Sequence, residues 1–125
     1  TGGNGPDVIY DPVGGDFTEP ALRSIAWAGR FLVIGFAAGN IPKIPLNLYL
    51  VKGCSAVGVF WGAFTMREPQ NHLANMQQLA QWHEEGKINA PVTQTFSLEN
   101  AADALDTILA RKATRKIALT TSFHK

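Results

Sequence analysis

The strongest constraint on the fold is an apolar run without alternation, FLVIGF at residues 31–36. A strand with one solvated face alternates apolar and polar side chains, whereas a strand covered on both faces is apolar throughout. Two other runs, VIY at residues 8–10 and SAVGVFWG at residues 55–62, have the same character. The three runs therefore predict strands of a parallel sheet that helices cover on both faces.

Segments with helical periodicity alternate with these runs. Asp16 and Glu19 resemble a capping box, Pro45 and Pro69 suit a first helical position, and Gly53 suits a helix end. Two of these helices have a clear inner stripe, namely Phe17, Ala21, Leu22 and Ile25 before a stop at Gly29, and Leu73, Met76, Leu79, Ala80 and His83 before a stop at Gly86.

The carboxyl-terminal part adds one more helix between two strands. VTQTF at residues 92–96 and RKIALTT at residues 115–121 are the predicted strands, and Ser97 is the predicted helix cap. The apolar face of this helix comprises Leu98, Ala101, Ala102, Leu105, Ile108 and Leu109. The full order β-α-β-α-β-α-β-α-β is an α/β layout, in which ligands bind beyond the carboxyl ends of the strands. The loops expected there are VGGD, FAAGN and WGAFT.

Composition narrows the class of protein. The chain has 125 residues, of which 46% are hydrophobic and 17% charged, as in an ordinary globular domain. A formal net charge of +1 gives no electrostatic basis for binding nucleic acid or an anionic membrane. No apolar run approaches the roughly 18–20 residues that span a bilayer. The single cysteine, Cys54, cannot form an internal disulfide. We therefore expect a soluble, cytoplasmic protein.

The sequence gives little support to metal binding or to nucleophilic catalysis. His72 and His83 are separated by about 16 Å if they share a helix, which is too far for one zinc ion. His124 lies in the tail, and Cys54 has no histidine near it in sequence. Asp11 precedes a proline and is interpreted as a turn residue. We expect no metal and no catalytic side chain in this chain.

Three long motifs then point to a family. DVIYDPVGGD, GRFLVIGFAAGNIPKIPLNLYLVK and SAVGVFWGAF occur in this order and closely resemble the quinone oxidoreductases, from the zinc-free branch of the medium-chain dehydrogenase/reductases. SLENAADALDTILARKATRKIALT resembles the carboxyl-terminal helix and strand of that family. The resemblance implies the second half of a Rossmann-type doubly wound parallel sheet in residues 1–85. It also implies a carboxyl-terminal β-α-β segment, residues 86–125, that returns to the catalytic domain.

Members of this family are much longer than 125 residues and carry a glycine-rich G-x-G-x-x-G fingerprint after their first Rossmann strand. TGGNG at residues 1–5 precedes a strand instead of following one, so it does not fit that fingerprint. We therefore interpret the chain as the carboxyl-terminal portion of a longer enzyme, with the phosphate-binding loop elsewhere.

The resemblance also implies a cofactor site for NADPH. In this family two loops contact the nicotinamide half of the cofactor, largely through backbone groups, and small residues allow the close approach. In this sequence the matching residues are Gly35, Phe36, Ala37 and Ala38 in one loop, and Val59, Phe60 and Trp61 in the other.

The implied reaction is hydride transfer from NADPH to a quinone or an activated enone, with this chain inactive by itself. The strand at residues 55–61 is expected to pair with its symmetry mate in a homodimer, because an unpaired apolar edge promotes aggregation. Two alternatives stay open. One is a non-catalytic dimerising α/β module. The other is half of an S-adenosylmethionine methyltransferase, whose acid-ended strands resemble VIYDPVGG but whose fold ends in an antiparallel hairpin.

Overall fold

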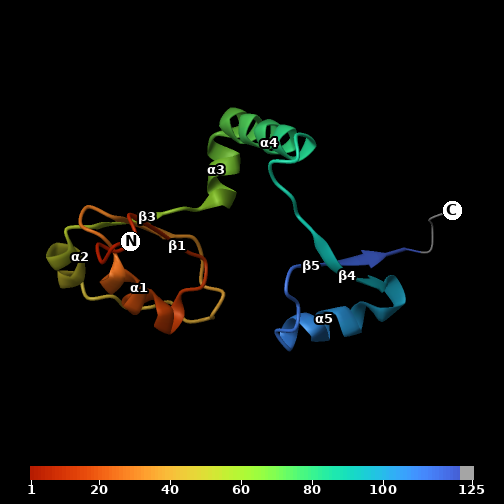
Figure 1. The fold of residues 1–125 in the computed structure, drawn as a ribbon, viewed down its shortest axis with the longest axis horizontal. Coiled ribbons are helices and arrows are strands. Elements are labelled where there is room, and N and C mark those ends of the chain that lie inside the picture. The colour runs from red at the N-terminus through yellow and green to blue at the C-terminus, as the bar shows by residue number, and fades with distance from the viewer. Residues whose placement is uncertain (122–125) are drawn as a thin grey trace. The chain divides into compact units, whose positions relative to one another are not determined.

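The structure is a computed structural model in which residues 1–121 are described. The chain divides into two compact units, Thr1–Pro69 and Gln70–Lys125, and each is considered by itself (Figure 1). The predicted division near residue 85 concerns the domains of the longer family members, and it stays a prediction.

The first unit contains the predicted parallel sheet. Strands β1 (Val8–Asp11), β2 (Arg30–Val33) and β3 (Ser55–Gly58) pair in the order β1-β2-β3, and both pairings are parallel. Asp11 lies opposite Val33, and Val33 lies opposite Gly58. The three strands therefore end in one row, and the loops that follow them start at the same edge of the sheet.

Helices and a small core cover one face of this sheet. The helical elements of the first unit are η1 (Gly15–Phe17), α1 (Thr18–Ser24), α2 (Asn47–Lys52) and α3 (Trp61–Arg67). Leu22 and Ile25 from the α1 region pack against Phe31 of β2 and Leu48 of α2, and these four side chains form the buried cluster. Gly53 ends α2 in the left-handed conformation, as the sequence predicts.

The second unit contains a pair of strands that one helix connects. Its elements are α4 (Pro69–Glu84), which starts at the last residue of the first unit, β4 (Val92–Ser97), η2 (Leu98–Asn100), α5 (Ala101–Leu109) and β5 (Lys116–Thr120). Strands β4 and β5 are parallel, with α5 as the connection between them. Pro69 opens α4 as predicted.

Several predicted element boundaries are wrong. The strand predicted for residues 31–36 ends at Val33, because the amides of Ile34 and Gly35 both turn to the Asp11 carbonyl. The strand predicted for residues 55–62 ends at Gly58, and the helix α3 begins at Trp61.

The helix starts differ as well. The capping box is wrong, because Asp16 lies inside the short turn η1 and makes no capping bond, while Glu19 pairs with Arg23 instead. The first helix ends at Ser24 instead of near residue 28, because Ile25 is extended. The second begins at Asn47, two residues after the predicted position. Ser97 precedes η2 but makes no side-chain capping bond to it.

The predicted apolar faces of α4 and α5 are formed but not covered within the described chain. Leu73, Met76 and Leu79 of α4 are exposed, and so are Leu105 and Ile108 of α5. Periodicity identifies such a face but not what packs on it. No helix in residues 1–121 is long and apolar enough to cross a membrane.

Candidate functional site

The candidate site lies where the three parallel strands end. The β1 loop is defined as residues 12–15, the β2 loop as residues 34–40, and the β3 loop as residues 59–60. Since the strand ends form one row, the three loops are neighbours at the carboxyl edge of the sheet. This is the edge at which α/β sheets bind their ligands.

Backbone hydrogen bonds attach the β2 loop to β1 and its loop. The amide of Gly35 donates to the Asp11 carbonyl over 3.3 Å, that of Ala37 to Pro12 over 3.1 Å, and that of Ala38 to Val13 over 2.9 Å. These bonds hold the main chain of the β2 loop against β1 and the β1 loop. They also consume three of the amide groups that a ligand could otherwise use.

Asp11 in turn holds the β1 loop in shape. One carboxylate oxygen accepts from the amides of Val13 and Gly14, each over 2.9 Å, and the other accepts from the Thr18 hydroxyl over 2.9 Å. Burial alone would raise the pKa of Asp11, but the bonds from Gly14, Val13 and Thr18 together hold it below its ordinary value. The interpretation of Asp11 as a turn residue is confirmed.

Two adjacent glycines let the loops approach each other. Gly14 and Gly15 have φ values of 68° and 62°, which side-chain-bearing residues rarely adopt. A Cβ atom on Gly14 would lie 2.7 Å from the Phe36 ring, and one on Gly15 would lie 3.0 Å from the Ala38 Cβ. Asp11, Gly14 and Gly15 therefore shape the site. None of them is among the predicted cofactor-binding residues, although the two glycines lie in VGGD, one of the loops predicted at this edge.

A few backbone groups in these loops stay free of hydrogen bonds to the rest of residues 1–121. Among them are the amide of Phe36, the carbonyl of Val59 and the amide of Phe60. The Val59 amide is used, because it donates to Val33 over 2.9 Å. The Val59 carbonyl and the Phe60 amide belong to one trans peptide group and point in opposite directions, so a single ligand group can bond to only one of them. Within residues 1–121 the Phe36 and Phe60 amides are two free donors, one from each loop.

The structure brings together four of the seven predicted site residues. Gly35, Phe36, Val59 and Phe60 line one cavity of about 270 Å³ between the β2 and β3 loops. Ala37 and Ala38 are exposed farther along the β2 loop and do not line this cavity. Trp61 lines a neighbouring cavity of about 640 Å³, with Phe60, Phe64 and Arg67. The cofactor roles of these residues stay predictions.

The residues considered for metal binding are dispersed. His72 and His83 lie on the single helix α4, and Cys54 is half-buried in the first unit. His124 is outside the described residues. Within residues 1–121 no group of three histidine, cysteine or acidic side chains could hold a metal ion.

A parallel sheet whose strand ends carry a glycine-shaped loop cluster defines the class, a Rossmann-type α/β fold. A sequence model of the zinc-binding dehydrogenase family matches residues 1–119. The chain belongs to this family of oxidoreductases, and within it the chain resembles the carboxyl-terminal portion of the quinone oxidoreductase-like members.

Relatives and solved structures agree with this assignment. Quinone oxidoreductase-like protein 2 homolog of Nematostella vectensis is 40% identical over 122 residues, 97% of this chain and 33% of that protein. Quinone oxidoreductase-like protein 2 of Bos taurus is 38% identical over 118 residues, 94% of this chain and 34% of that protein. The chain thus spans about a third of the length of these relatives.

The structural neighbours show the same fold. A quinone oxidoreductase of Pseudomonas syringae superposes with a TM-score of 0.79 at 25% identity, over 94% of this chain and 36% of that one. A mycobacterial protein in complex with NADPH superposes with a TM-score of 0.82 at 24% identity, again over 94% and 36%.

The family description raises the question of zinc. A zinc site needs three or four nitrogen, sulfur or carboxylate ligands around one point. Residues 1–121 bring no such set together, so this part of the chain does not fit a zinc ion, and no chemical role is assigned to one here.

Proposed function

We propose that this chain supplies the nicotinamide-contacting loops of an NADPH-dependent quinone oxidoreductase, an enzyme that reduces a quinone or an activated enone. The observation that carries the proposal is that Phe36 and Phe60, whose amides have no hydrogen-bond partner within residues 1–121, line the same cavity as Gly35. Family membership and the NADPH bound to a neighbour of the same fold support the choice of cofactor.

Each loop has a separate task in this proposal. The carboxamide carbonyl of a nicotinamide is an acceptor, which matches the free Phe60 amide. Gly35 presents bare backbone to the ring or its ribose, and the Phe36 amide is available to the same part of the ligand. When bound, NADPH supplies the hydride, and these residues orient it.

The first test uses reduced nicotinamide mononucleotide, because it contains the half of the cofactor that these loops would hold. Amide NMR of the 125-residue chain should show shifts concentrated at Phe36 and at Val59 and Phe60 as the mononucleotide reaches millimolar concentration. An absence of shifts, or shifts confined to the second unit, would contradict the proposal.

Gly35→Ala separates ligand binding from folding. A Cβ atom on Gly35 would lie 3.4 Å from the Pro12 carbonyl oxygen, an ordinary contact, and the backbone there does not require glycine. The methyl group would instead occupy space at the cavity. We expect mononucleotide affinity to fall roughly tenfold, as one misplaced methyl group costs about 1–3 kcal/mol in a close-packed site. The unfolding midpoint should stay unchanged.

The homodimer is part of the same proposal. Strand β3 is an edge strand of its sheet, and all four of its residues are exposed. An uncovered edge favours pairing with a second strand, and the copy of β3 in another molecule provides one. Sedimentation should give a dimer at micromolar concentration. Ala56→Pro should reduce it by removing an amide donor from the free edge, because the Ser55 and Val59 amides donate to Gly29 and Val33 and the amide of the alternate residue points the other way. A clean monomer for the unaltered chain would overturn this part of the proposal.

A further inference from the structure

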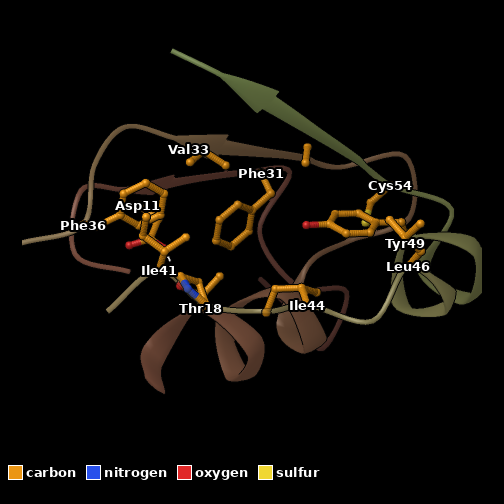
Figure 2. A pocket seen from close by; sticks show the side chains of 12 residues that line it. Asp11, Thr18, Phe31, Val33, Phe36, Ile41, Ile44, Leu46, Tyr49 and Cys54 are labelled. Atoms are coloured by element: carbon orange, nitrogen blue, oxygen red, sulfur yellow. Dashed lines mark hydrogen bonds between the residues drawn. The ribbon is translucent and has the colours of Figure 1, made fainter. Parts of the chain in front are cut away.

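A third cavity lies on the face of the sheet that carries α1. It has a volume of about 500 Å³ and lies between β2, α2 and the connecting segment at residues 41–46 (Figure 2). Its walls include the side chains of Phe31, Phe36, Ile41, Ile44 and Tyr49. This volume is within the range of about 300–1,000 Å³ found for small-molecule pockets. We call it the accessory pocket.

The accessory pocket is separate from the cavity between the β2 and β3 loops. The two cavities share Val33 and Phe36 of their walls, and the other lining residues differ. An occupant of the accessory pocket would therefore contact neither Val59 nor Phe60.

One end of the accessory pocket is polar but already satisfied. The Thr18 hydroxyl donates to one oxygen of Asp11, and the amides of Val13 and Gly14 occupy the other oxygen. A ligand gains little from these groups, because binding to them would replace hydrogen bonds that are already made.

The opposite end carries a polar group that has no hydrogen-bond partner within residues 1–121, so a ligand there would replace water and not a protein group. Figure 2 shows the Tyr49 hydroxyl pointing toward Phe31, and it makes no hydrogen bond to any of residues 1–121. Burial raises the pKa of Tyr49, and Cys54 beside it adds to the effect, so the hydroxyl is neutral at physiological pH and can donate or accept.

We propose that the accessory pocket binds a small, neutral, aromatic molecule that carries one hydroxyl or carbonyl group, with that group bonded to the Tyr49 hydroxyl. The rings of Phe31, Phe36 and Tyr49 provide aromatic faces for a planar ligand, and Ile41 and Ile44 provide apolar contact. The single available polar partner limits the ligand to one polar end. This proposal does not depend on the proposed oxidoreductase function.

Two matched probes test the hydrogen bond. 1-Naphthol has the required hydroxyl, and 1-methylnaphthalene has nearly the same shape without it. Calorimetric titration of the 125-residue chain should show tighter binding of 1-naphthol, and Tyr49→Phe should weaken that binding roughly threefold to tenfold, as expected for one neutral hydrogen bond. Binding of 1-methylnaphthalene should be unchanged by Tyr49→Phe. An equal loss for both probes, or for neither, would overturn the assignment to Tyr49.

Filling the accessory pocket tests its location. Ala56 lines it from β3 and is exposed, so Ala56→Phe should place a ring in the pocket without overpacking the buried core. Ser55→Phe is the control, because the neighbouring residue of a strand points to the opposite face of the sheet. We expect Ala56→Phe to weaken 1-naphthol at least tenfold and Ser55→Phe to leave it unchanged, with equal far-ultraviolet circular dichroism. Unchanged binding in Ala56→Phe, or no binding to the unaltered chain, would overturn the proposal.

Discussion

The two compact units differ in how much of their apolar surface they bury. The first unit has a closed cluster of Leu22, Ile25, Phe31 and Leu48, whereas in the described part of the second unit Ala104 is the one buried apolar residue. Both units have parallel strands and an amphipathic helix, so the difference does not arise from secondary structure. It arises because two helices pack on the sheet of the first unit, and α5 alone contacts the two strands of the second.

This comparison indicates which unit is stable by itself. Burial of apolar side chains is the main favourable term in folding, so a unit that buries few of them opens easily. The exposed leucines of α5, including Leu105 and Leu109, are suited to contact with surfaces beyond those described here.

The largest effect is expected from the core of the first unit. Phe31 is 1% exposed, and Phe31→Ala should destabilise the chain by about 3–5 kcal/mol, because it leaves a cavity in the buried cluster. Leu105 of α5 is 62% exposed, and Leu105→Ala should change the free energy of unfolding by less than about 0.5 kcal/mol. Urea unfolding followed by fluorescence measures both.

A variant that keeps more of the core protects this test against complete unfolding. Phe31→Leu should retain a cooperative transition at lower urea concentration. Equal losses of stability in Phe31→Ala and Leu105→Ala would show that the second unit is packed as firmly as the first, which would contradict the difference in burial between the two units.

Features that depend on a few neighbouring residues could be predicted from the sequence, whereas features that depend on packing could not. The parallel strands, the helix stop at Gly53 and the helix start at Pro69 follow from local patterns, because continuous apolar runs, glycine and proline act over a few residues. The helix α3 was missed, because WGAF continues an apolar run without a change of period. The uncovered faces of α4 and α5 could not be foreseen, because burial depends on what packs against a stripe.

The candidate site shows the same limit. The order of strands predicts a ligand edge at the loops FAAGN and WGAFT. Residues 34–35 and 59–60 belong to the predicted strands, and Gly35, Val59 and Phe60 are predicted as site residues from the family resemblance alone. Which amides stay free could not be predicted, because that depends on the carbonyls of Asp11, Pro12 and Val13 in a neighbouring loop. The role of Asp11 was recognised as a turn but not as the anchor of Thr18.

The next effect compares two glycines with similar backbone conformations. Gly14 in the first unit has a φ of 68° and Gly86 in the second has a φ of 70°. Alanine at either position lowers the free energy of unfolding by about 1–2 kcal/mol, because the left-handed conformation is strained for a residue with a Cβ atom. A Cβ atom on Gly14 would also lie 2.7 Å from an atom of the Phe36 ring, whereas a Cβ atom on Gly86 would have no neighbour within 4 Å.

We therefore expect Gly14→Ala to cost about 1–3 kcal/mol more than Gly86→Ala, because a close-packed neighbour must move. Thermal unfolding of the two variants measures this difference directly. Adding Phe36→Ala to Gly14→Ala should recover part of the loss, since it removes the ring that obstructs the methyl group. Equal costs at both glycines would show that the loops of the first unit are as loosely packed as the end of α4.

The smallest effect is electrostatic and depends on pH. The folded state holds the pKa of Asp11 below its ordinary value of 3.8, so the unfolded chain takes up a proton first as the pH falls. The stabilisation from its hydrogen bonds is complete well above that value and is lost as the pH falls through the lower pKa of the folded state. Asp11→Asn should remove this part of the pH dependence and cost about 1 kcal/mol at neutral pH, because a neutral amide accepts more weakly.

The matched change in the second unit is Glu99→Gln. The pKa of Glu99 is also lowered, by its own backbone amide and then by Ser97, but its carboxylate is fully exposed, so solvent weakens those interactions. Urea midpoints should be measured between about pH 2 and pH 5. Their dependence on pH should therefore become weaker in Asp11→Asn and stay unchanged in Glu99→Gln. The reverse result would place the acid-sensitive contacts in the second unit, and it would show that Asp11 does not stabilise the loops at the carboxyl edge of the sheet.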